Sequence, residues 1–171
     1  MYKLILIILI LVGSCNPKKN SLSGIVEKTY YLNGALKSTK EYKNGKSDWK
    51  TTEYFENGKV SSVANYHNGK FIEEVVFFYS NGKENFKQNY DSAGKSHGMF
   101  YLWSENGQLK QKGPYEHGKM HGEWKNFFDV GKTESIENYV NGKRNGRWIY
   151  FSDKGDTLRE EIYRNDSLVK K

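Results

Sequence analysis

Glycine and tyrosine recur along this chain at a fixed interval, and that interval constrains the fold more than any other feature. Two interleaved glycine series advance in steps of 24 residues, with one extra residue near Asp91. The first series is Gly34, Gly58, Gly82, Gly107, Gly131 and Gly155. The second is Gly45, Gly69, Gly94, Gly118 and Gly142, each preceded by a tyrosine. A period of this length is the signature of a repeat protein, and it predicts a repeat domain over residues 26–171.

The turns of the repeat are rich in Asn-Gly, the dipeptide that favours two-residue type I′ hairpins. It occurs at residues 33–34, 44–45, 57–58, 68–69, 81–82, 106–107 and 141–142. About seven to nine residues remain between turns, which is a usual strand length and too short for a helix with its connections. The sequence therefore predicts an all-β fold, an elongated single-layer antiparallel meander of about 12 strands built from roughly six 24-residue hairpin repeats.

Strand alternation assigns the aromatic side chains to faces of the sheet. The tyrosines before the second glycine series return to one face in every repeat, so we expect them to form a ladder. We expect a second ladder from the aromatic residues four positions before the first series, which are Tyr30, Tyr54, Phe78, Trp103, Phe127 and Phe151. Gly98, Gly122 and Gly146 are expected to offer bare backbone on which neighbouring rings lie flat.

The consensus Asn-Gly-x-Leu-x5-Tyr-x-Asn-Gly-Lys-x2-Gly-x-Trp resembles the bacterial MORN-variant repeat, and it is clearest in residues 117–131 and 141–155. The resemblance implies an elongated, twisted, single-layer antiparallel sheet. Many bacterial relatives are labelled antitoxins of toxin–antitoxin systems. Some eukaryotic MORN proteins are linked to membranes or to protein scaffolds.

Residues 1–14 predict a lipoprotein signal peptide. Leu4–Val12 is an apolar run of nine residues, about 14 Å as a helix and roughly half of what a bilayer core requires. Small residues directly precede Cys15, the only cysteine of the chain, in a pattern that resembles a bacterial lipobox. We expect cleavage before Cys15 and its lipidation, with residues 15–25 as lipidated cysteine and polar tether. An ordinary signal peptide with an incidental cysteine is the alternative.

The residues that could carry chemistry form no catalytic pattern. No serine stands in a Gly-x-Ser-x-Gly elbow. His97 and His121 occupy the same position in successive repeats, about 10 Å apart, which is too far to share a zinc ion. His117 and His121 can approach across a turn, but they supply only two ligands. We therefore expect no enzyme activity, no metal site and no cofactor.

Two surfaces are candidates for binding. The candidate partner-binding residues are Tyr66, Tyr90, Tyr115, Tyr139, Trp103, Trp124 and Trp148. The candidate basic edge consists of the lysines that directly follow the second glycine series, Lys46, Lys70, Lys95, Lys119 and Lys143. Such an edge fits an anionic surface, although solubility alone would also explain these lysines. The chain as a whole carries a formal net charge of +7.

These features predict a non-catalytic protein-binding scaffold, anchored by lipid at Cys15 in the bacterial cell envelope and facing the periplasm or exterior. Its partner is an unidentified protein, and nucleic acid is disfavoured because the signal exports the chain. The alternatives are an antitoxin or immunity-type protein that neutralises a toxin by direct binding, and a glycan-binding module. A glycan binder should show isolated rings beside Asn, Asp or Gln, whereas a protein-binding sheet should show a contiguous aromatic patch.

Overall fold

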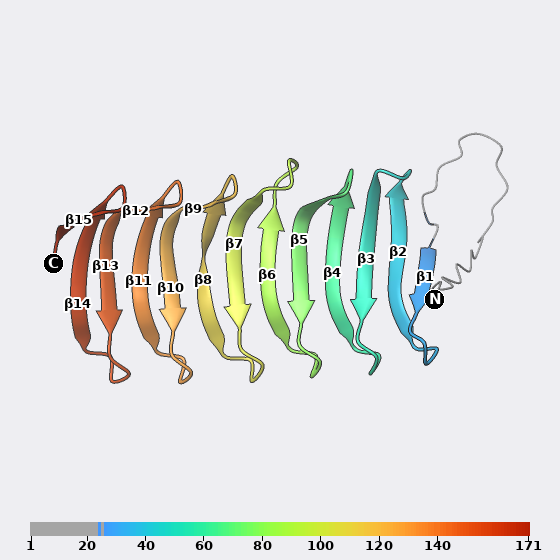
Figure 1. The fold of residues 1–171 in the computed structure, drawn as a ribbon, viewed down its shortest axis with the longest axis horizontal. Coiled ribbons are helices and arrows are strands. Elements are labelled where there is room, and N and C mark those ends of the chain that lie inside the picture. Colours follow the sequence, from blue (N-terminus) through green and yellow to red (C-terminus); the bar gives the residue numbers. More distant parts are fainter. Residues whose placement is uncertain (1–23, 25) are drawn as a thin grey trace.

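The protein is one long antiparallel sheet in which each strand lies beside the next strand of the chain (Figure 1). The computed structural model describes Gly24 and residues 26–171. The predicted signal peptide (1–14), Cys15 and all of the predicted tether except Gly24 lie outside the described residues. Among the residues described, there is no helix long and apolar enough to cross a membrane.

The sheet contains 15 strands. They are β1 (Val26–Tyr30), β2 (Leu36–Asn44), β3 (Asp48–Tyr54), β4 (Val60–His67), β5 (Lys70–Phe78), β6 (Glu84–Tyr90), β7 (Ser96–Trp103), β8 (Leu109–Glu116), β9 (Lys119–Met120), β10 (Gly122–Phe127), β11 (Thr133–Val140), β12 (Lys143–Arg144), β13 (Gly146–Phe151), β14 (Thr157–Arg164) and β15 (Ser167–Lys170). The two-residue strands β9 and β12 lead into β10 and β13 after a single residue. The all-β meander of hairpin repeats is thereby confirmed, with three more strand segments than the 12 expected.

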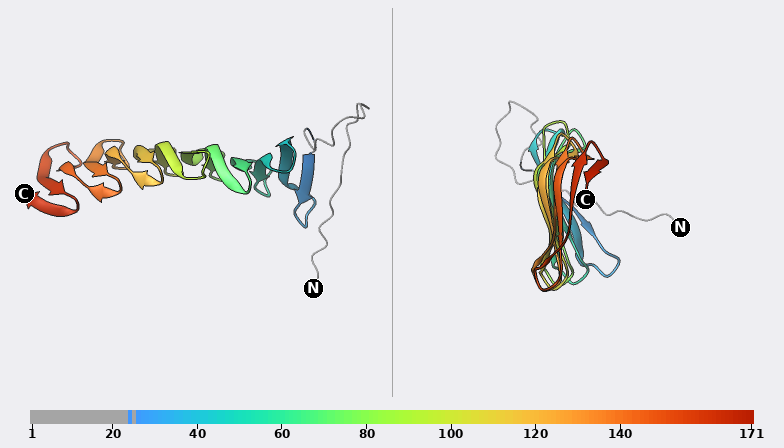
Figure 2. Two further views of the ribbon diagram at one scale, coloured as in Figure 1. Left: turned by 90° about the horizontal axis from the view of Figure 1, so that it is seen from above. Right: turned by 90° about the vertical axis from the view of Figure 1, so that its left-hand side faces the viewer.

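The sheet is a single layer along its whole length. Seen from above, it is thin, and it twists gradually from β1 to β15 (Figure 2). Seen end-on, the strands are bowed (Figure 2). Without a second layer, the side chains of one face must bury one another. The most buried residues, Val75, Trp124 and Gln88, all lie on the face that carries the tyrosines.

The turns of the first glycine series are five-residue loops, and together they form what we call the long-loop edge. In the loop between β1 and β2, the Tyr31 N–H donates to the Ala35 carbonyl and the Gly34 N–H donates to the Tyr31 carbonyl. The same two bonds recur in the loops at residues 55–59, 79–83, 104–108, 128–132 and 152–156. In these loops glycine has a positive φ, whereas the preceding asparagine does not. The type I′ prediction is therefore wrong for this edge.

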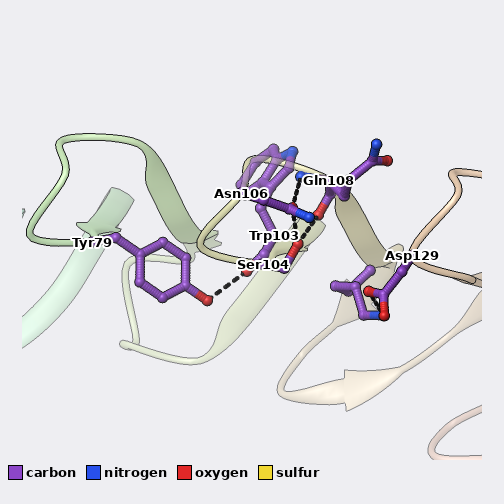
Figure 3. A network of polar contacts seen from close by, with 7 residues as sticks. Tyr79, Trp103, Ser104, Asn106, Gln108 and Asp129 are labelled. Atoms are coloured by element: carbon purple, nitrogen blue, oxygen red, sulfur yellow. Dashed lines mark hydrogen bonds and ion pairs between the residues drawn. The ribbon is translucent and has the colours of Figure 1, made fainter.

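The asparagine of these loops has a different use. The Asn33 side-chain oxygen accepts a hydrogen bond from the Ala35 N–H at 2.9 Å, and Asn57, Asn81 and Asn106 make the same bond two residues onward. Such a local bond stabilises a turn without requiring a left-handed asparagine. Figure 3 shows Asn106 in this role beside Ser104 and Gln108.

The turns of the second series form the opposite, short-turn edge. At 68–69, 117–118, 141–142 and 165–166 both central residues have positive φ, as a type I′ turn requires. The prediction is therefore confirmed for the Asn-Gly turns at 68–69 and 141–142. The single extra residue of the sequence lies at residues 91–95, where a five-residue loop with the long-loop hydrogen bonds replaces the two-residue turn.

The role predicted for Gly98, Gly122 and Gly146 is wrong. All three have positive φ, and the nearest side-chain atoms to an added Cβ belong to Asn89, Pro114 and Asn138 rather than to a ring. Gly122 and Gly146 follow a break in their strands, and Gly98 lies beside a register shift between β6 and β7. A left-handed glycine fits such irregular positions. The glycine that does underlie a ring is Gly113 in β8, where an added Cβ would overlap the Trp124 indole.

Candidate partner-binding face and basic edge

The predicted tyrosine ladder forms as two separate runs, and within each run a ring from the intervening strand lies between successive tyrosines. Trp49 stacks on Tyr66 with ring centroids 5.1 Å apart, and Phe71 contacts both Tyr66 at 5.0 Å and Tyr90 at 5.3 Å. With Tyr42 at its end, this first run holds five rings. We call the face that carries it the ladder face.

A second run of rings continues along the same face toward β14. Trp148 lies between Tyr139 and Tyr163, with centroids 5.1 Å and 5.3 Å away, and Trp124 contacts Tyr115 at 5.0 Å. The members of this second run are Phe77, Phe86, Phe100, Tyr115, Trp124, Tyr139, Trp148 and Tyr163. Ring pairs at these separations stabilise a sheet beyond the area they bury.

Both runs include rings of β5 and β6, and β5 is irregular between its two rings, Phe71 and Phe77. Glu73 has a φ of 58°, and the register between β4 and β5 shifts beside it. A shallow depression of about 320 Å³ opens here, lined by His67, Ile72, Glu73, Tyr90 and Ser92. A bulge of this kind re-aims side chains and commonly marks a functional surface.

The candidate residues divide by burial. The Trp124 and Trp148 residues are only 1% and 6% exposed, and their Nε1 atoms donate to the carbonyls of Pro114 and Asn138, both at 3.0 Å. Both indoles thus form the core of the sheet. The candidate tyrosines Tyr66, Tyr90, Tyr115 and Tyr139 are half-buried, so they provide the ring surface that a partner could contact on this face.

Trp103 lies apart from the other candidates. Its ring stacks on Tyr101 with centroids 5.5 Å apart, and Tyr101 alternates with Phe100 and so lies on the opposite face. Figure 3 shows the Tyr79 hydroxyl donating to the Trp103 carbonyl at 2.8 Å. Trp103 therefore belongs to a different surface from Trp124.

The second ladder predicted through Trp103 is wrong. No ring contact joins its six expected members, all of which the structure describes. The residues opposite them on the neighbouring strands explain this, because they are Leu36, Val60, Glu84, Leu109, Thr133 and Thr157. Equivalent residues two strands apart are about 10 Å from each other, and without an intervening ring they do not touch.

A row of polar side chains runs beside the second ring run, and sequence reasoning missed it. Asn126 donates through Nδ2 to Ser135 Oγ at 2.7 Å and to Glu137 Oε1 at 2.9 Å, and Gln111 donates to Asn126 Oδ1 at 2.9 Å. The Tyr139 hydroxyl donates to Glu137 Oε2 at 2.9 Å. These positions vary between repeats, which is why the periodic pattern did not reveal them.

Burial raises the pKa of four ladder tyrosines, Tyr66, Tyr90, Tyr115 and Tyr139. For Tyr90 and Tyr115 desolvation is the main cause. For Tyr66 and Tyr139, desolvation acts first and the nearby carboxylates Glu53 and Glu137 raise the pKa further. These four hydroxyls are therefore neutral hydrogen-bond donors throughout the physiological range.

The five lysines of the candidate basic edge are exposed. They directly follow turns of the short-turn edge, which lies along the top of Figure 1. An added Cβ on Gly118 or Gly142 would lie 3.6 Å from the Cβ of Lys95 or Lys119 in the preceding repeat. The aliphatic stems of these lysines therefore cover the next turn, which gives them a packing role besides the exposed charge.

One contact between histidines was not expected from the sequence. The rings that meet are His97 and His117, with centroids 5.7 Å apart, whereas His121 Nδ1 lies 3.2 Å from Glu116. Over the part of the chain that the structure describes, no group of three or more His, Cys, Asp or Glu side chains is arranged to hold a metal ion.

Residues 25–44, 50–68, 96–117 and 120–141 match the MORN repeat variant. The chain is a MORN-variant repeat protein. The loops at 79–83 and 152–156 lie outside the matched segments, but they contain the same two hydrogen bonds as the loops inside those segments. The MORN-type hairpins therefore continue through the whole described sheet.

No curated protein matches the chain. Among solved structures, a mutant of S. aureus TarM in complex with Fondaparinux, alpha-GlcNAc-glycerol and UDP is similar at 14% identity and a TM-score of 0.40. The match covers 67% of this chain and 21% of that one. A second TarM structure matches at 14% identity and a TM-score of 0.38, covering 63% and 19%. The MORN-variant protein thus spans about a fifth of the TarM chains, and so weak a likeness carries nothing about function.

Proposed function

We propose that this MORN-variant protein is a non-catalytic scaffold of the bacterial cell envelope that binds a protein partner on its ladder face. The observation that supports this most is that the two ring runs lie on one face and together extend from β2 to β14. Half-buried tyrosines line both runs, and such rings offer large, rigid contact area at little conformational cost. Runs of neighbouring rings suit a protein partner better than the isolated rings of a glycan site.

The basic edge takes a secondary role in this proposal. Its ammonium groups are exposed, so their interactions are weakened by salt over a Debye length of about 8 Å at physiological ionic strength. An anionic membrane surface attracts such lysines by about 1 kcal/mol each when they lie close to it. We assign the edge to orienting the sheet beside the membrane to which a lipidated Cys15 would tether it.

A glycan-binding role is the second candidate, and the polar row favours it. Gln111, Asn126 and Glu137 lie beside the second ring run, and amide and carboxylate groups next to rings are what sugar hydroxyls recognise. The antitoxin or immunity interpretation uses the same ladder face as the scaffold, and it differs only in the identity of the bound protein.

Site-specific photocrosslinking in living cells tests the proposal. A benzophenone amino acid is placed at Tyr90 or Tyr115 on the ladder face, and, as the matched control, at Trp103 on the opposite face. We expect the ladder positions to give one protein adduct that the Trp103 position lacks. Equal adducts from both faces, or adducts from Trp103 alone, would contradict the assignment of the binding face.

The same cells test the anchor. Cys15→Ala should remove palmitate labelling and release the protein from the membrane fraction, or leave an uncleaved precursor. Labelling that persists in the variant would refute lipidation at Cys15. Adding soluble glycans during illumination distinguishes the protein-binding proposal from the glycan-binding one. Soluble glycans should reduce crosslinking from the ladder face only if that face binds glycans.

A further inference from the structure

Among the described residues, two of the most exposed leucines lie at opposite ends of the sheet. Leu32, in the loop between β1 and β2, is 110% exposed, and Leu158, in β14, is 69% exposed. Single exposed apolar side chains are ordinary on protein surfaces. These two differ because of the positions they occupy in the repeat.

Both positions are polar in every other repeat. The position of Leu158 is filled elsewhere by Lys37, Ser61, Asn85, Lys110 and Glu134. The position of Leu32 is filled elsewhere by Glu56, Ser80, Glu105, Asp129 and Asp153. Leucine therefore replaces a polar residue only in the outermost hairpin at each end of the sheet.

Inside the sheet, these two positions are joined by an ion pair in one pair of neighbouring repeats. Lys110 Nζ lies 2.8 Å from Asp129 Oδ1, and Asp129 is labelled in Figure 3, where a dashed line marks this ion pair. Lys110 has the repeat position of Leu158, and Asp129 has that of Leu32. The ion pair thus connects one hairpin repeat to the next along the long-loop edge.

We propose that a second copy of this chain stacks on the first head-to-tail, with its β1 beside β14 of the first copy. If the 24-residue period continues across the junction, Gly34 of the second copy follows Gly155 of the first. Leu32 then takes the same place relative to Leu158 that Asp129 takes relative to Lys110. An apolar pair at the junction replaces the ion pair found inside.

The strands at the two ends have matching free edges. β15 covers only Ile162–Arg164 of β14, and the residues before Ile162, apart from Glu161, are exposed. Among the described residues β1 pairs only with β2. In the 24-residue repeat, the position of Val26, the first residue of β1, is equivalent to position 171. Lys170, the last residue of β15, therefore lies directly before the position at which β1 would begin. In the continued sheet, β15 and the β1 of the second copy would therefore both pair with β14, one after the other along its length, as β12 and β13 both pair with β11.

The register of β11 and β13 fixes the contacts across the junction. Ile136 pairs with Ile149 there, and the equivalent pair at the junction is Glu160 opposite Lys28, which are oppositely charged. Extending this register by two residues brings Leu158 opposite Tyr30, another exposed apolar side chain. Opposite charges and apolar contacts directly across a strand pair both stabilise a sheet.

Such a junction joins different surfaces of identical chains. An interface of this type does not close on itself unless the rotation per copy happens to form a ring, so it produces open-ended assemblies. We therefore expect the full chain to sediment as a series of species that grows with concentration, with no single limiting size.

Sedimentation velocity on the full chain, with Leu158→Lys and Leu32→Asp as single variants, tests the interface. Each variant should weaken association by about tenfold or more, because a lone charge replaces an apolar anchor. The double variant carrying both changes rebuilds the Lys110–Asp129 pair across the junction, and it should recover association that is now sensitive to salt. Val130→Lys is the matched control, because Val130 is exposed in the loop between β10 and β11, away from both ends of the sheet. This variant should leave association unchanged.

A wild-type chain that stays monomeric at all concentrations would overturn the proposal, as would equal losses in the Val130→Lys control. Direction is tested separately in a Cys15→Ala background. Chains carrying Leu32→Cys should form disulfides with chains carrying Leu158→Cys and not with themselves. Disulfides formed mainly between two Leu158→Cys chains would show a back-to-back contact and refute the head-to-tail arrangement.

Discussion

At the scale of single residues, the packing of Trp124 depends on a missing Cβ. The Trp124 indole lies on the backbone of Gly113, and an ideal Cβ there would be 2.6 Å from Cε2 of the ring. The indole is held in place by its Nε1 bond to the Pro114 carbonyl, and it is almost fully buried. It therefore has no free space into which it could move.

We predict that Gly113→Ala lowers the free energy of unfolding by about 2–3 kcal/mol, because overpacking forces the ring or the backbone to shift. Urea denaturation followed by tryptophan fluorescence measures the loss. In a Trp124→Leu background the same change should cost much less, since a smaller side chain leaves room for the methyl group. Equal losses in both backgrounds would show that the strain does not come from the indole.

This contact could not be predicted from the sequence. The expectation for Gly98, Gly122 and Gly146 rested on a glycine next to an aromatic residue along the chain. The actual approach is between β8 and β10, so it depends on the register of two strands, which pairs Lys112 with Lys125. The tyrosine ladder, in contrast, follows from alternation within each strand and could be predicted residue by residue.

At the scale of elements, the two edges of the sheet are built from different turns although both contain Asn-Gly. The dipeptide at 141–142 makes a two-residue turn with both residues left-handed. The dipeptide at 106–107 lies inside a five-residue loop in which only the glycine is left-handed. The hairpins themselves were predictable because turn residues and strand lengths are local properties. The turn type was not, because the same dipeptide satisfies both geometries.

We predict that Gly142→Val lowers the free energy of unfolding by about 1–3 kcal/mol, because a β-branched residue is strained at a φ of 80°. Lys143→Val is the matched control, since the neighbouring position is an exposed strand residue that tolerates branching. Both variants are compared by urea denaturation. A loss at residue 143 as large as that at residue 142 would argue against backbone strain as the cause.

At the scale of the whole molecule, the ladder tyrosines link stability to alkaline pH. Folding raises the pKa of Tyr66, Tyr90, Tyr115, Tyr139 and Tyr163. A group whose pKa is raised by folding contributes its full stability below its unfolded pKa, which is about 10 for tyrosine. That contribution is lost as the pH rises from there through the folded pKa, because the unfolded chain has already released its protons.

We therefore predict that the free energy of unfolding is steady up to about pH 10 and falls steeply above it. Denaturant titrations at several pH values, with tyrosinate absorbance recorded in parallel, measure this. Tyr115→Phe should reduce the slope of the free energy of unfolding against pH above pH 10 by up to the equivalent of one proton. Stability near neutral pH should be almost unchanged. An unchanged slope in this variant would mean that Tyr115 ionises normally in the folded sheet.

The pairing of each strand with its successor has a consequence for how the protein is made. Paired residues are close in sequence, and even Asp48 and His67, at the ends of β3 and β4, are only 19 residues apart. Contact order is therefore low for a protein made entirely of strands, a class that usually folds slowly because its pairings are distant. A nascent chain can add one hairpin at a time to the growing sheet as each emerges, and no hairpin needs to wait for the last one.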